Sequence, residues 1–81
     1  MKAEIKKGGR AHFPGTTTVE CTTDSARELD LSGIANEARG VAANEFGCDP
    51  KDVQVSTPTL TTAEDGDYRM DVEARNTRRG R

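Results

Sequence analysis

Residues near the C-terminus alternate between apolar and polar side chains with a period of two. Four apolar residues share one side of the segment 68–75, and charged residues fill the positions between them: Tyr68, Met70, Val72 and Ala74. This alternation is typical of a half-buried β-strand. The Asp65-Gly66 pair just before it suits a tight turn with positive φ. We therefore expect a β-hairpin around this turn.

The first strand of that hairpin is expected over the stretch DVQVSTPTL, which begins at Asp52. Val53 and Val55 alternate with polar residues there. Pro58 has no amide hydrogen to donate, so it does not fit a central strand. The sequence predicts that this strand lies at an edge of the sheet or carries a bulge.

The first half of the chain contains two further candidate strands. Residues 2–7 place Ala3 and Ile5 on one face and charges on the other, which indicates a weak strand. Residues 8–15 are rich in glycine and proline and predict a loop. Residues 16–23 are rich in β-branched side chains and predict a second strand, with Val19 and Cys21 on one face.

A helix is predicted over residues 31–46, with an earlier turn over 25–29. Asp30 can act as the N-cap, Gly47 suits a left-handed C-terminal position, and Pro50 prevents continuation. One face of this helix carries apolar residues at helical spacing: Leu31, Ile34, Ala35, Ala38, Val41, Ala42 and Phe46.

The order of these elements is ββαββ. It predicts an α+β fold in which a single helix packs on one face of a four-stranded antiparallel sheet. We expect one domain over residues 1–76 and a basic, disordered tail over residues 77–81. The expected core joins three helix residues to three sheet residues: Ile34, Val41 and Phe46 with Val55, Met70 and Val72.

The chain has few residues with which to build that core. Leu, Ile, Val and Phe together number 12 of the 81 residues. Small domains with a thin apolar core are commonly stabilised by disulfides, metals or oligomerisation. Self-association as a homodimer is therefore expected, through an edge strand or through the outer face of the helix.

No set of residues predicts catalysis, a metal or a cofactor. His12, the single histidine, lies in the glycine-rich loop, and Cys21 and Cys48 are far from it and from each other in sequence. Close ligand pairs and a nucleophile with a held base are both missing. We expect a protein that is not an enzyme and has no cofactor. The absence of a signal peptide and of a long apolar run predicts a cytoplasmic protein with reduced cysteines and no membrane partner.

Charge is distributed unevenly along the chain. Residues 1–12 carry a net charge of +3, residues 13–68 carry −8, and residues 69–81 carry +3. If the first and last strands are neighbours, the two basic ends form one patch that attracts phosphates. The candidate nucleic-acid residues are Lys6, Lys7, Arg10, Arg75, Arg78, Arg79 and Arg81. Few aromatic residues are present to stack on bases, which disfavours binding of single strands.

The polar face of the predicted helix is the second candidate surface. Gly33 and Gly40 are seven residues apart and so share one face, opposite the apolar stripe. Each glycine inside a helix costs about 1 kcal/mol relative to alanine, and both leave room for close approach by a partner. The candidate protein-contact residues are Gly33, Asn36, Glu37, Gly40 and Asn44, with Ala43 beside them.

The leading hypothesis is a small non-enzymatic binding module that acts through protein contacts, as an inhibitor, an adaptor or an assembly factor. The alternative is a nucleic-acid-binding protein that uses its basic ends. A short ββαββ chain without catalytic residues resembles many small proteins of phages and mobile elements, at the level of fold alone.

Overall fold

The computed structural model describes residues 1–6 and 15–78 of the chain. Its elements follow in chain order as β1 (Lys2–Ile5), β2 (Thr16–Thr23), the 3₁₀ turn η1 (Ala26–Glu28), α1 (Leu31–Phe46), the 3₁₀ turn η2 (Pro50–Asp52), β3 (Val53–Val55), β4 (Thr59–Glu64) and β5 (Asp67–Asn76).

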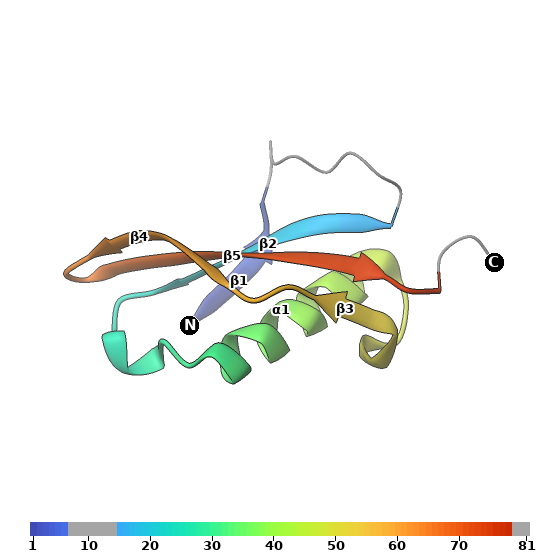
Figure 1. Cartoon of the computed structure of the whole chain (residues 1–81), viewed down its shortest axis with the longest axis horizontal. Helices are drawn as coiled ribbons and strands as arrows, with labels where there is room; N and C mark the ends of the chain where they lie inside the picture. The colour runs from blue at the N-terminus through green and yellow to red at the C-terminus, as the bar shows by residue number, and fades with distance from the viewer. Residues whose placement is uncertain (7–14, 79–81) are drawn as a thin grey trace.

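The strands form one antiparallel sheet, and α1 packs against one of its faces (Figure 1). The order is β1-β2-β5, and β3 and β4 both pair with the far side of β5, one after the other along its length. The predicted α+β class with one helix on one face of an antiparallel sheet is confirmed. The sheet has five strands because the predicted strand after Asp52 is divided in two.

Ser56 and Pro58 explain this division. The Ser56 amide donates to the Glu73 carbonyl at 2.9 Å, but the Glu73 amide donates to the Ser56 side-chain oxygen at 3.0 Å instead of to a backbone carbonyl. The serine hydroxyl thus ends the β3 ladder. Pro58 cannot donate to a ladder, and pairing resumes at Thr59 with a register shift between Leu60 and Thr62. The edge position predicted from Pro58 is found, and the register shift lies beyond Pro58, inside β4.

The core lies between α1 and the central strands β2 and β5. Their register pairs Val19 with Val72 and Cys21 with Met70, and these side chains are buried. The buried cluster consists of Val19, Cys21, Ile34, Ala38, Ala42, Ala43, Val53, Met70, Val72 and Ala74. Four of its ten members are alanines, so the expectation of a thin core holds.

Three details of the predicted helix face need correction. Leu31, which fits the apolar stripe, is 58% exposed at the start of α1. Ala43, predicted on the outer face, is buried. Val41 and Phe46 were expected in the core, and they pack at its margin and are half-buried.

The predicted helix boundaries are confirmed. The Asp30 carboxylate accepts a hydrogen bond from the Gly33 amide at 3.2 Å, and Gly47 adopts the left-handed conformation with φ of 72°. Gly66 in the β4–β5 turn has φ of 82°, as the Asp65-Gly66 pair predicts.

The chain after β5 is tied back to η2. The Thr77 amide donates to the Asp52 carbonyl at 2.8 Å, and the Arg78 guanidinium lies 3.7 Å from the Asp52 carboxylate. The first two residues of the predicted tail are therefore placed by contacts. Residues 79–81 lie outside the described residues.

Candidate protein-contact surface

The outer face of α1 contains a shallow hollow of about 630 Å³. Its lining residues are Gly33, Asn36, Glu37, Gly40, Val41 and Asn44. We call this hollow the α1 groove. All five residues predicted from the sequence as protein contacts line it, and the structure adds Val41 at its border with the core.

The two glycines differ in the space around them. At Gly33, an added Cβ would lie 2.9 Å from the Asp30 carboxylate oxygen that caps the helix, so the capping side chain would have to shift to admit it. At Gly40, an added Cβ would meet no atom within 4 Å. Gly40 therefore costs helix stability without any packing reason inside the described fold. A function at the groove floor would explain it.

The polar groups of the groove are amides and one carboxylate. Asn36 is held by Arg39, whose guanidinium donates to the Asn36 side-chain oxygen at 2.7 Å and to the Val53 carbonyl at 3.3 Å. Glu37 is exposed at the rim. Among the residues that the structure describes, no lysine or arginine lines the groove. A partner that offers N–H donors or a positive charge is therefore complementary to it.

The nucleic-acid candidates that the structure describes are each engaged with a polar partner. The Lys6 ammonium lies 2.7 Å from the Asp71 carboxylate, and the Arg75 guanidinium donates to the Gln54 side chain at 2.6 Å. Arg78 lies near Asp52, as described above. Lys7, Arg10, Arg79 and Arg81 lie outside the described residues.

The condition under which the two basic ends would form one patch, that the first and last strands are neighbours, is not met. β2 lies between β1 and β5, because the segment after the first loop pairs with both. On the face away from α1, the register places Glu20 between Glu4 and Asp71 in one row across three strands. This acidic row crosses the sheet from β1 to β5. Lys6 reaches across to Asp71, and this hydrogen bond raises the pKa of the Lys6 ammonium.

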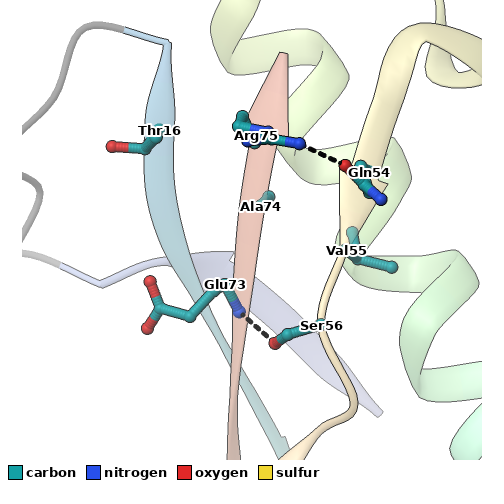
Figure 2. Close-up of a pocket in the computed structure, with 7 residues that line it drawn as sticks. All are labelled: Thr16, Gln54, Val55, Ser56, Glu73, Ala74 and Arg75. Atoms are coloured by element: carbon teal, nitrogen blue, oxygen red, sulfur yellow. Dashed lines mark hydrogen bonds between the residues drawn. The ribbon is translucent and has the colours of Figure 1, made fainter. Parts of the chain in front are cut away.

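A second hollow, of about 350 Å³, lies where β3 leaves β5 (Figure 2). Arg75 and Gln54 close it at one end, and the bond from the Glu73 amide to Ser56 closes it at the other. Glu73 points away from this hollow toward β2, where its carboxylate accepts from the Thr18 hydroxyl at 3.1 Å. These polar groups are paired with one another and gather no catalytic set.

The residues considered for catalysis or metal binding are not assembled in the described structure. Cys21 is buried, and this burial raises the pKa of its thiol to about 11, with a smaller contribution from Glu37. Cys48 is half-buried and also unpaired. His12 lies outside the described residues. Among residues 1–6 and 15–78, no group of three or more His, Cys, Asp or Glu side chains is placed to hold a metal ion.

Comparison with known proteins gives no family for this chain, so its function has to be inferred from the geometry. No protein-family model, curated protein or solved structure matches this chain. In the described part of the chain, no helix is both long enough and apolar enough to span a membrane.

Sequence reasoning identified the α1 groove and missed its apolar wall. Val41 was placed in the core because its spacing fits the apolar stripe. It lies at the edge of that stripe, so one side of its side chain packs inward and the other borders the groove. Whether a residue at the edge of the stripe lies in the core or at its border depends on where the sheet ends. The helix periodicity gives no information about that position.

Proposed function

We propose that this protein is a non-enzymatic binding module that contacts a partner protein through the α1 groove. The observation that carries the proposal is Gly40, an exposed glycine in the middle of α1 with open space above it. A partner backbone or a small side chain fits closest to the helix at this position. Inhibitor, adaptor and assembly factor are the roles compatible with such a contact.

The chemistry of the groove limits the kinds of partner segment that fit it. Glu37 offers one negative charge, the Asn44 amide offers an acceptor and a donor, and Val41 offers an apolar wall. The Asn36 side-chain oxygen is already occupied by Arg39. We expect a partner segment with a small or apolar residue at its centre and N–H donors or a lysine or arginine beside it. A cytoplasmic setting fits the two unpaired cysteines.

The proposal is tested by affinity capture from a lysate treated with nuclease. Wild type is compared with Gly40→Arg, which fills the groove, and with Ala26→Arg, which makes the same charge change at an exposed residue outside it. We expect a partner that wild type and Ala26→Arg retain and Gly40→Arg loses. A partner retained equally by all three proteins contradicts the assignment to the groove.

The nucleic-acid alternative is examined in the same experiment. Partners that are captured from untreated lysate and lost from nuclease-treated lysate would favour binding to nucleic acid. Affinity for short DNA and RNA measured over a range of salt gives a direct reading, because each phosphate contact contributes about 0.9 to the slope of log affinity against log salt. Steep salt dependence that flattens when residues 77–81 are removed would overturn the proposed function.

A further inference from the structure

Each described strand except β2 and β5 has a side that no other strand pairs. Such edges recruit other strands unless charges, proline or a covering element protect them. β1 is protected by charge, since Lys2 and Glu4 lie within its four residues and Lys6 follows it. A strand added to β1 would place its side chains beside these charges.

β3 is protected by α1. It has three residues, and the Arg39 side chain donates to the Val53 carbonyl at 3.3 Å. This contact occupies a backbone acceptor that an added strand would need. The guanidinium also places a positive charge at this end of the edge.

β4 is less protected. No helix among the described residues covers its edge, and its one charged residue is Glu64, at its end. Residues 59–63 read TLTTA, with no charge and no proline, and five of the six residues of β4 are exposed. Leu60, the second residue of this stretch, is 51% exposed. Pro58 and Glu64 bound the stretch on its two sides, so an added strand can pair over only a few residues.

A hollow of about 300 Å³ adjoins the start of β4. It lies between the first turns of α1 and the segment that links β3 to β4. Four of its lining residues are apolar, Leu31, Ala35, Val55 and Pro58, and four are polar, Ser32, Arg39, Ser56 and Thr57. Leu31 lines this hollow and Leu60 follows Pro58 by two residues in the chain, and both are large and strongly exposed apolar side chains. Figure 1 shows β4 and β5 continuing as an arm past the start of α1.

We propose that two copies of this chain associate through their β4 edges, antiparallel about a two-fold axis near Leu60. In this arrangement the two Leu60 side chains face each other and lie next to the Leu31 hollows. Residue Glu64 of each copy lies level with Ser56 of the other. The acidic turn at Glu64 and Asp65 therefore approaches the β3 edge of the second copy, where Arg39 supplies the opposite charge.

The pairing is self-complementary, so it closes as a dimer and does not propagate into a fibre. It is also weak, because a few strand residues and two leucines bury less than the roughly 800 Å² per partner of a stable interface. The register shift between Leu60 and Thr62 limits the ladder further. The α1 groove lies on another side of the helix, so this inference does not depend on the proposed function.

The test is the molar mass by sedimentation equilibrium from about 5 to about 500 µM, a range that brackets a micromolar dissociation constant. Wild type should approach twice the monomer mass at the upper end. Leu60→Lys, which sets two like charges face to face, should weaken association at least about tenfold. The matched control Asn44→Lys, on the α1 groove, should dimerise like wild type.

A monomer mass for wild type over the whole range would overturn the proposal. So would a dimer that Asn44→Lys disrupts and Leu60→Lys does not, because the contact would then be the outer face of α1. Thermal melts show whether each variant is folded. If Leu60→Lys is unfolded, cross-linking decides: in a Cys48→Ser background, Leu60→Cys should form a disulfide-linked dimer under mild oxidation and Thr57→Cys should not. Equal cross-linking of the two would also contradict the proposal.

Discussion

Asp71 is the residue whose polar atoms are least well satisfied in the described fold. One carboxylate oxygen accepts from Lys6, and the other is buried with no hydrogen-bond partner. Glu20 lies beside Asp71 in the ladder, and like charges directly opposite one another are unfavourable. Lys6 therefore offsets the repulsion between Glu20 and Asp71, on the face of the sheet that α1 does not cover.

Replacing Lys6 by methionine should lower the free energy of unfolding, because it leaves Asp71 without its counter-charge. The double variant Lys6→Met/Asp71→Asn should recover much of this loss, since it removes the unpaired charge as well. Urea unfolding of the wild type and the two variants measures the difference. A double variant less stable than Lys6→Met would show that Asp71 has another role.

Cys21 makes the free energy of unfolding depend on pH in the alkaline range. Burial raises the pKa of its thiol from 9.0 to about 11. Between these values the unfolded chain loses the proton and the folded chain keeps it, so the free energy of unfolding falls as pH rises through this window. The fall should be smaller in Cys21→Ala, and comparing the two proteins cancels other groups such as Lys6.

The same burial predicts different reactivity for the two cysteines. At neutral pH a thiol reagent should modify the half-buried Cys48 while Cys21 stays unmodified until the protein unfolds. Mass spectrometry after timed labelling counts the modified thiols. Equal rates for both would mean that the β2 face of the core opens readily.

At the scale of the element, α1 is capped at both ends but carries a glycine of low helix propensity, Gly40, near its centre. An added Cβ at Gly33 would approach the Asp30 carboxylate, whereas Gly40 has open space around it. Gly40→Ala should raise the free energy of unfolding by about 0.5–1 kcal/mol. Gly33→Ala should give a smaller gain, because the capping carboxylate must shift to admit the new Cβ. Thermal melts of the two variants provide the comparison, and an equal gain at both positions would contradict this account of Gly33.

At the scale of the whole molecule, stability depends on a few large side chains among many small ones. Ile34, Val19 and Val72 are among the largest fully buried side chains. Ile34→Asp should unfold the domain, because a buried unpaired charge is strongly unfavourable. Gly40→Asp should remain folded. Circular dichroism of both variants checks this, and similar loss of structure in both would mean that α1 packs with a different face.

Val41→Asp should have an effect between those of Gly40→Asp and Ile34→Asp. The helix periodicity places Val41 in the core, where a buried charge would unfold the domain. Its half-buried position beside the α1 groove lets an aspartate turn toward solvent. A melting temperature between those of Gly40→Asp and Ile34→Asp follows from this geometry.

Most of the elements could be predicted because each depends on residues close in sequence. The start and end of α1 follow from Asp30 and Gly47, the turn between β4 and β5 follows from Gly66, and the alternation after Tyr68 gives β5 its two faces. The residues of the α1 groove could be predicted for the same reason, because helical spacing alone places Gly33 and Gly40 on one face.

The tertiary structure decided which strands are neighbours and which edges stay open. β2 separates β1 from β5, so the first and last strands are not neighbours. The bond from the Glu73 amide to Ser56 divides the predicted strand, and Arg39 covers β3 but not β4. These outcomes depend on pairing between segments far apart in the chain, and local periodicity carries no information about which distant segment supplies the partner.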